Sequence, residues 1–245
     1  MKVRKSNRFE SFFHEFVKDF GGEVLPESQE GQTSDDLFRS QDIIAELKTL
    51  TADQTNDINR KLTPRVLEWI RKNGRIFPGL IQGPKHLVAF KDMPREIQMF
   101  WLGLLKAAVE PLIREANRQI RDTKHRMNLC SAKGMMLIAN GSNLYHDHPD
   151  SFRRLIAEVL RKRTPVGDLR FPHINGTVYF SFDDVKSRDE RMYFWANLQM
   201  KQAPQEDTSV FATFQAELQQ GWYKYIQKFI GIEVRQHSQP TEPST

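Results

Sequence analysis

A long helical stretch that separates two groups of strand-like segments constrains the fold of this chain more than any other feature. Before it, a helical segment is followed by three short strand-like runs, the last of them at residues 42–48. After it, residues 134–140 form an apolar run with the character of a buried strand. A short hairpin, a helical crossover and a buried strand are typical of an α/β sandwich. We therefore predict an α/β fold with a mixed central sheet flanked by helices.

Helical periodicity and turn residues set the boundaries of the expected elements. Five phenylalanines and one valine recur at helical spacing within residues 8–20, and Gly21-Gly22 ends this first helix. Further helices are expected over residues 51–73, 94–127, 149–163 and 210–230, and Pro111 is expected to kink or break the second of these. Strands are expected over residues 23–25, 35–38, 42–48, 134–140, 174–182 and 191–200. Residues 27–34 are expected to form a loop.

Length and composition fit one large domain. Of the 245 residues, we assign 1–236 to a single domain and 237–245 to a disordered tail. No apolar run approaches the roughly 20 residues that cross a bilayer, and the basic N-terminus lacks the apolar stretch of a signal peptide. A cytoplasmic location without a membrane partner is therefore expected. The single cysteine excludes an intrachain disulfide framework and a Cys-rich zinc site. The net charge of +5 is compatible with a nucleic-acid partner but does not establish one.

Two charged residues, Glu46 and Lys48, interrupt the apolar run at residues 42–48. Alternate side chains of a strand share a face, so Glu46 and Lys48 point the same way, while Ala45 and Leu47 point into the opposite apolar layer. Asp35 belongs to the preceding strand, and a hairpin would bring its carboxylate beside Glu46. Two charges on such a strand are costly unless they are paired or used.

Two converging carboxylates and a strand carbonyl oxygen form a hard oxygen site of the kind that suits Mg²⁺ or Mn²⁺. Such a metal lowers the pKa of a bound water and neutralises charge on a phosphate. Lys48 fits as an ammonium that orients the attacking water or stabilises the developing charge. The competing interpretation is a surface Glu/Lys pair on an edge strand, because a bare Glu-x-Lys pattern should occur about once by chance in such a chain.

At these residues the chain resembles the PD-(D/E)xK nuclease superfamily, whose members have a restriction-endonuclease-like fold. Residues 34–38 look like the family's aspartate strand, although Ser34 replaces the usual proline, and residues 43–48 look like its Glu-x-Lys strand. The helix that opens with Arg8-Phe9-Glu10 is similar to the first helix of Mrr-like members, in which a glutamate often joins the metal site. Residues 116–124 are similar to a helix that places Gln or Lys near the scissile phosphate, and residues 134–140 look like the strand that follows it.

The resemblance covers about residues 8–182 and implies a restriction-endonuclease-like core. Residues 51–110 would be a helical insertion, and residues 190–232 would be a C-terminal extension of a strand and a helix. The implied activity is that of a Mg²⁺-dependent (or Mn²⁺-dependent) endonuclease that hydrolyses phosphodiester bonds in double-stranded DNA, in restriction or phage defence. A homodimer or a defence-system partner would fit such a role. The alternatives are a catalytically inactive DNA-binding or assembly protein on the same fold, and an RNA-directed nuclease.

The resemblance implies a set of site residues, two of which have alternatives. Asp35 and Glu46 would bind the metal, and the catalytic set would be Asp35, Glu46, Lys48, Glu10 and Gln119. Asp36 remains an alternative to Asp35, which is preferred because Leu37 would share its face. Glu15, at the opposite border of the phenylalanine stripe, remains an alternative to Glu10. Gln119 falls in a helical stripe where a polar group needs a partner, either a phosphate or the backbone.

Contacts with nucleic-acid phosphates are expected from a basic cluster in the second half of the long helical stretch. Its members are Arg114, Arg118, Arg121, Lys124 and Arg126, of which Arg118, Arg121 and Lys124 are the expected nucleic-acid-binding residues. A second basic cluster, formed by Arg153, Arg154, Arg161, Lys162 and Arg163, is the alternative. The competing interpretation of each cluster is a solvated charged face.

Overall fold

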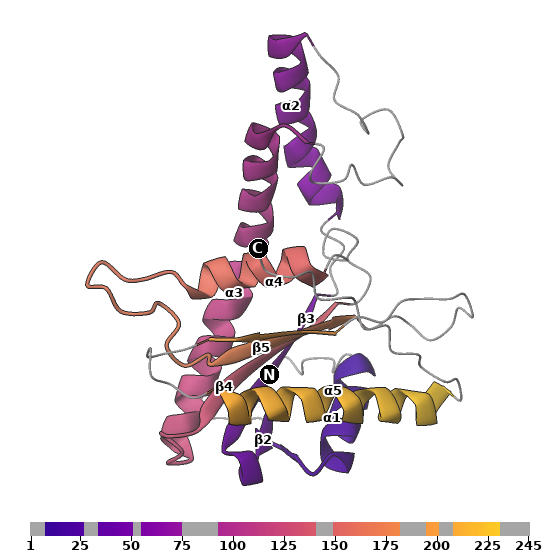
Figure 1. Ribbon diagram of the computed structural model, residues 1–245, viewed down its shortest axis with the longest axis vertical. Coiled ribbons are helices and arrows are strands. Elements are labelled where there is room, and N and C mark those ends of the chain that lie inside the picture. Colours follow the sequence, from indigo (N-terminus) through magenta and orange to yellow (C-terminus); the bar gives the residue numbers. More distant parts are fainter. Residues whose placement is uncertain are drawn as a thin grey trace, which may run out of the picture.

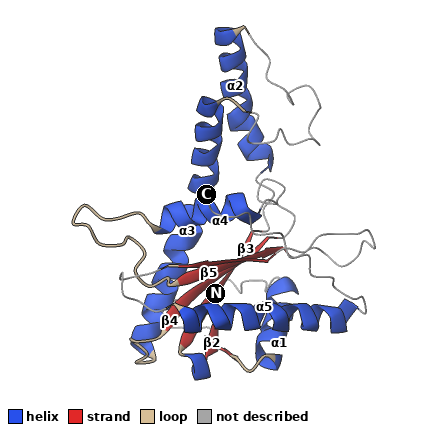
Figure 2. Cartoon of the chain, in the orientation of Figure 1, coloured by secondary structure: helices blue, strands red, loops and turns tan. Residues whose placement is uncertain are grey.

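The computed structural model describes residues 8–26, 34–50, 55–74, 93–140, 149–181, 195–200 and 208–230. These residues form an α/β fold in which a six-stranded mixed sheet has helices on both faces (Figures 1 and 2). The strands are β1 (Glu23–Val24), β2 (Asp36–Phe38), β3 (Ile43–Leu50), β4 (Lys133–Asn140), β5 (Gly176–Ser181) and β6 (Trp195–Gln199). The α-helices are α1 (Arg8–Asp19), α2 (Thr55–Asn73), α3 (Arg95–Arg126), α4 (Pro149–Leu160) and α5 (Ser209–Ile230), and a 3₁₀ turn, η1 (Arg39–Gln41), links β2 to β3.

The strands lie in the sheet in the order of the sequence. β1, β2 and β3 pair antiparallel, β3–β4 and β4–β5 pair parallel, and β5–β6 pair antiparallel. Parallel neighbours need a crossover, and α3 and α4 provide these two connections. The predicted α/β class, with a mixed sheet entered through a hairpin and continued after a helical crossover, is confirmed.

Each face of the sheet has its own hydrophobic core. On one face, Ile44 of β3 packs in a cluster with α2, α3 and α4, which includes Ile113. On the other face, Ile43 packs in a cluster with α1 and α5, which includes Phe13 and Trp222. The alternation along β3 places its apolar residues in both cores, as expected for a central strand covered on both sides. The rings of Phe13 and Trp222 lie 5.3 Å apart, so the predicted phenylalanine stripe of α1 packs on α5.

An arm of two antiparallel helices projects from the sheet in Figure 1 and falls within the predicted insertion at residues 51–110. It consists of α2 and the first half of α3, which share buried apolar residues such as Leu62 and Trp101. The Arg65 guanidinium reaches the Glu96 carboxylate across the two helices, with Nη2 2.8 Å from Oε1. No described helix is both long enough and apolar enough to cross a membrane.

Several predicted boundaries differ from those observed. Of the kink or break expected at Pro111, the break is wrong, because α3 is one helix of 32 residues that contains Pro111. A proline inside a helix costs about 3 kcal/mol, and burial of Val109 and Ile113 on either side offsets that cost. The helix expected to reach residue 163 ends at Leu160. Most of the predicted loop at residues 27–34, and the whole tail at 237–245, lie outside the described residues.

Candidate active site

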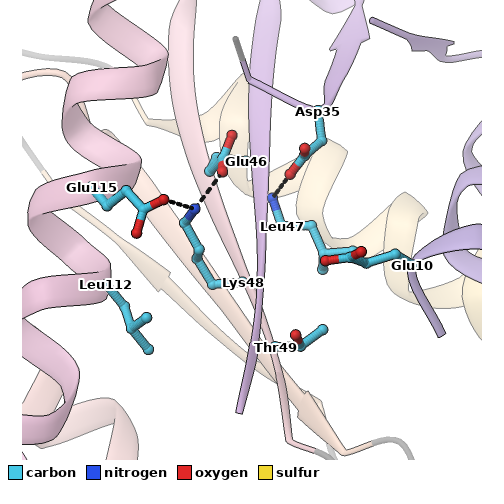
Figure 3. Close-up of a pocket in the computed structure, with 8 residues that line it drawn as sticks. All are labelled: Glu10, Asp35, Glu46, Leu47, Lys48, Thr49, Leu112 and Glu115. Atoms are coloured by element: carbon cyan, nitrogen blue, oxygen red, sulfur yellow. Dashed lines mark hydrogen bonds and ion pairs between the residues drawn. The ribbon is translucent and has the colours of Figure 1, made fainter. Parts of the chain in front are cut away.

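The hairpin of β2 and β3 places two carboxylates side by side. Asp36 pairs with Ala45 in the antiparallel ladder, so Asp35, one residue earlier, lies opposite Glu46. The Asp35 side chain is fixed by the backbone, because the Leu47 N–H donates a hydrogen bond of 2.8 Å to its Oδ2 (Figure 3). Asp35 and Glu46 line the same pocket. The prediction that a hairpin brings Asp35 beside Glu46 is confirmed.

Asp36, the alternative to Asp35, lies on the opposite face of the sheet. Its side chain is fully buried, and Oδ1 lies 3.8 Å from His14 Nε2 on α1. Burial raises the pKa of Asp36 well above its usual range, and the charges of Asp35 and Glu46 raise it further. Burial of this side chain therefore disfavours its charged form. Asp35 is therefore the aspartate that faces the pocket.

Lys48 has three acceptors around its ammonium group. Nζ lies 2.7 Å from Glu46 Oε1 and 3.2 Å from Glu115 Oε1, and it donates a hydrogen bond of 2.7 Å to Gln119 Oε1. Glu46 and Lys48 point to one face of β3, as predicted, and Gln119 and Glu115 reach them from α3 (Figure 3 shows Glu46, Lys48 and Glu115). An ammonium has three N–H donors, so all three are matched.

Glu46 is held in an environment that opposes its charge. Its side chain is 1% exposed, and among the described residues Oε2 has no hydrogen-bond partner. Burial, followed by the charge of Asp35, raises the pKa of Glu46 from 4.5 to about 8, although Lys48 acts in the opposite direction. The pKa of Asp35 is also raised, mainly by burial, while the Leu47 N–H and Lys48 lower it. Perturbed carboxyls that converge in a cleft are typical of functional sites.

The helix glutamate of the pocket is Glu10, not Glu15. Glu10 lines the pocket from α1. Glu15 is exposed, and its Oε2 lies 3.5 Å from the Tyr225 hydroxyl of α5, on a different side of the helix. The choice that the sequence left open is therefore decided by the packing of α1.

The pocket is small and strongly acidic. Its volume is about 100 Å³. The lining residues are Glu10, Asp35, Glu46, Leu47, Lys48, Thr49, Leu112 and Glu115. Four carboxyls and one ammonium give it a formal charge of −3 when all are ionised, and of −2 while Glu46 holds its proton. Such a pocket favours cations, and it would repel a phosphate unless cations neutralise part of the charge.

Glu115 is a site residue that the sequence analysis missed. It precedes Gln119 by four residues, which is one turn of helix, so the two share a side of α3. This spacing was the signal that could have identified it. Because Glu115 flanks the apolar stripe of α3 instead of lying within it, the pattern alone does not distinguish it from a solvated charge.

The predicted basic cluster is only partly exposed. Arg118 and Arg121 lie on the surface of α3, and Arg121 Nη2 is 2.8 Å from Asp122 Oδ1. Arg118 follows Glu115 by three residues, so it lies close to the pocket on the helix surface. Lys124 is only 8% exposed, and burial lowers its pKa. Lys124 is therefore the least exposed member of the predicted basic cluster, because this part of α3 packs against the protein.

The donors of the pocket fit a hard divalent cation. Within the described part of the chain, no three His, Cys, Asp or Glu side chains already surround a common metal position. Asp35 and Glu46 nevertheless provide carboxylate oxygens from two paired strands, and no described residue gives the buried Oε2 of Glu46 a hydrogen-bond partner. Oxygen donors are those that Mg²⁺ and Mn²⁺ prefer.

Comparisons with protein-family models, with curated proteins and with solved structures found no match to this chain. The geometry of the pocket is therefore the basis for the function proposed below. That geometry combines the neighbouring carboxyls of Asp35 and Glu46 with the Lys48 ammonium and its three acceptors. The helix that forms one wall, α3, also carries exposed arginines.

Proposed function

We propose that this protein is a metal-dependent endonuclease that hydrolyses phosphodiester bonds in DNA, a deoxyribonuclease of the PD-(D/E)xK type with a restriction-endonuclease-like core. The observation that carries the proposal is the convergence of Asp35, Glu46 and Lys48 in one acidic pocket across two paired strands. The sheet order, with α1 on one face and α3 on the other, supports it. A surface Glu/Lys pair is disfavoured by the burial of both side chains.

Asp35 and Glu46 are the residues that would hold Mg²⁺ or Mn²⁺. When bound, such an ion neutralises charge on the phosphate and lowers the pKa of a coordinated water. Binding of the cation also allows Glu46 to ionise, because a positive charge offsets the desolvation of its carboxylate. Glu10 adds a further carboxyl to the pocket wall.

Lys48 would act on the reacting phosphate through its charge. Its ammonium can orient the attacking water and stabilise negative charge that develops at phosphorus, where water attacks in line with the leaving oxygen. Gln119 fixes the position of Nζ through a buried hydrogen bond. Preorganised charge of this kind typically changes a rate by about a hundredfold or more.

Duplex DNA is the favoured substrate class because α3, which contributes Glu115 to the pocket, also carries two exposed arginines. Arg118 and Arg121 could contact phosphates on either side of the scissile bond. The alternatives, an RNA-directed nuclease and an inactive DNA-binding or assembly protein, are distinguished by the following test.

The test is cleavage of supercoiled plasmid in millimolar Mg²⁺ or Mn²⁺ by the wild type, Lys48→Ala, Glu46→Ala and a control, Lys61→Ala. Lys61 is an exposed lysine of α2, so its removal changes the net charge by the same amount as Lys48→Ala. We expect nicking or linearisation by the wild type and the control, and a loss of at least about a hundredfold in both site variants. Circular dichroism checks that the variants fold.

Two results would contradict the proposal in different ways. Undiminished cleavage by Lys48→Ala and Glu46→Ala would show that the activity lies elsewhere or comes from a contaminant. No cleavage by the wild type with either metal, on plasmid, single-stranded DNA or RNA, would favour the binding or assembly protein. Cleavage of RNA alone would favour the RNA-directed nuclease.

A further inference from the structure

Glu115 differs from the other acceptors of Lys48 in its exposure. Its side chain is 31% exposed, whereas the Glu46 side chain is 1% exposed. It is also the most distant of the three, at 3.2 Å, compared with 2.7 Å for Glu46 and for Gln119. In Figure 3, Glu115 extends from α3 toward Lys48 and meets it at Nζ. Glu115 is therefore the acceptor of Lys48 that solvent, or a ligand in the pocket, can reach most easily.

The donors of Lys48 leave no place for an additional acceptor. An ammonium carries three N–H bonds, and the three oxygens of Glu46, Gln119 and Glu115 match them one to one. A phosphate oxygen that contacts Nζ must therefore replace one of these partners. Replacing Glu46 or Gln119 would leave a buried polar group without a partner, whereas a displaced Glu115 carboxylate can be hydrated.

We propose that Glu115 is an anionic placeholder: its carboxylate accepts the Lys48 N–H that a substrate phosphate would otherwise use. When the phosphate binds, the Glu115 carboxylate moves away into solvent. The inference rests on the proposed function, because it concerns the same pocket. Carboxylate and phosphodiester oxygens are both anionic acceptors, so the exchange keeps the third N–H of Lys48 satisfied. Glu115 is thus a positioning residue that opposes substrate binding and takes no part in the chemical step.

The placeholder has a measurable cost in affinity. Two like charges held about 5 Å apart at an effective dielectric constant of about 20 would weaken binding more than a hundredfold. Withdrawal of the partly exposed Glu115 carboxylate into solvent reduces this to about tenfold. Removing the charge should therefore tighten binding by about tenfold. A metal ligand or a catalytic base would behave in the opposite way, because its removal would reduce turnover.

The experiment compares the wild type with Glu115→Gln, which keeps an oxygen acceptor for Lys48 and removes the charge. The control is Glu96→Gln, which makes the same change of charge on the same helix, at an exposed position paired with Arg65 of the arm. Two quantities are measured. One is the Kd for a fluorescein-labelled DNA duplex in EDTA, and the other is the separate KM and kcat for its cleavage in Mg²⁺.

We expect Kd and KM to fall about tenfold in Glu115→Gln, with kcat within about threefold of the wild type, and less than a twofold change in Glu96→Gln. An unchanged Kd, or an equal gain in the control, would overturn the proposal. So would a hundredfold loss of kcat, which would make Glu115 a catalytic residue or a metal ligand.

Results that refute the placeholder role of Glu115 can be distinguished from results that refute the proposed function. If the wild type cleaves nothing, the nuclease proposal fails, while the Kd values in EDTA still decide whether Glu115 opposes a phosphodiester at Lys48. If the wild type cleaves and the Kd values of wild type and Glu115→Gln agree, only the placeholder is refuted. Absence of binding by all three proteins in EDTA, together with no cleavage by the wild type in Mg²⁺ or Mn²⁺, refutes both.

Discussion

Replacing Glu46 by glutamine should stabilise the metal-free protein, and the gain should grow as the pH rises. The Glu46 carboxyl has its pKa raised from 4.5 to about 8, first by burial and then by the charge of Asp35. A carboxyl with a raised folded-state pKa favours the folded protein while it is protonated. In the unfolded chain it loses its proton near pH 4.5, so the folded state loses stability as the pH rises from there through about 8.

The magnitude follows from the two pKa values. They differ by about 3.5, and each pH unit in that interval is worth about 1.4 kcal/mol, which gives a penalty of about 5 kcal/mol above pH 8. Relaxation of the pocket and entry of water reduce this figure. We therefore expect the free energy of unfolding of Glu46→Gln, relative to that of the wild type, to increase by about 2 to 4 kcal/mol between pH 5 and pH 9. Asp35 and Asp36 are present in both proteins, so the difference reports Glu46 together with its charge coupling to these two carboxyls.

The assay is urea unfolding of both proteins at pH 5, 7 and 9 in EDTA, with the slopes checked for equality. The control is Glu68→Gln, which removes an exposed carboxylate of α2 and should change the free energy of unfolding by only a small amount. The reasoning is refuted if the wild type gains stability relative to Glu46→Gln as the pH rises. That result would mean that Lys48 keeps Glu46 ionised in the folded protein.

Three further predictions concern the metal and the core. Mg²⁺ should raise the melting temperature of the wild type and not that of Glu46→Gln. The rise should grow from pH 6 to pH 8.5, because the ion displaces a proton from the site. An equal rise in both proteins would place the ion elsewhere. Gly134→Ala should cost at least about 3 kcal/mol in urea unfolding, because its Cβ would lie 1.9 Å from the His173 carbonyl oxygen. At Gly103, on an exposed part of α3, the new Cβ meets no described atom within 4 Å. Gly103→Ala should instead raise the free energy of unfolding by about 0.5 to 1 kcal/mol. Equal effects at both glycines would contradict this reasoning. Trp222→Ala should cost about 3 to 5 kcal/mol because the ring is 1% exposed, and a cost below about 1 kcal/mol would show that α5 is not needed for the second core.

Local patterns predicted most elements because each covers a short range of sequence. The phenylalanine stripe of α1 indicates a helix with one buried face, and the observed helix packs that face on β5 and α5. The pair Glu46 and Lys48 shares a face because alternation is a property of any strand. The break at Pro111 was predicted wrongly for a related reason, because the local preference of proline was outweighed by burial of its neighbours on α3.

The sequence by itself determined the α/β class, the hairpin that sets Asp35 opposite Glu46, and the shared face of Glu46 and Lys48, because these follow from chain order and strand geometry. Only the tertiary structure decided which side of each helix faces the pocket. It brings Glu10 and Glu115 to the site, and it buries Lys124 of the predicted basic cluster. The physical reason is that the rotation of a helix about its axis is set by all the surfaces packed against it. Those surfaces come from segments far apart in the chain, so no short pattern contains them.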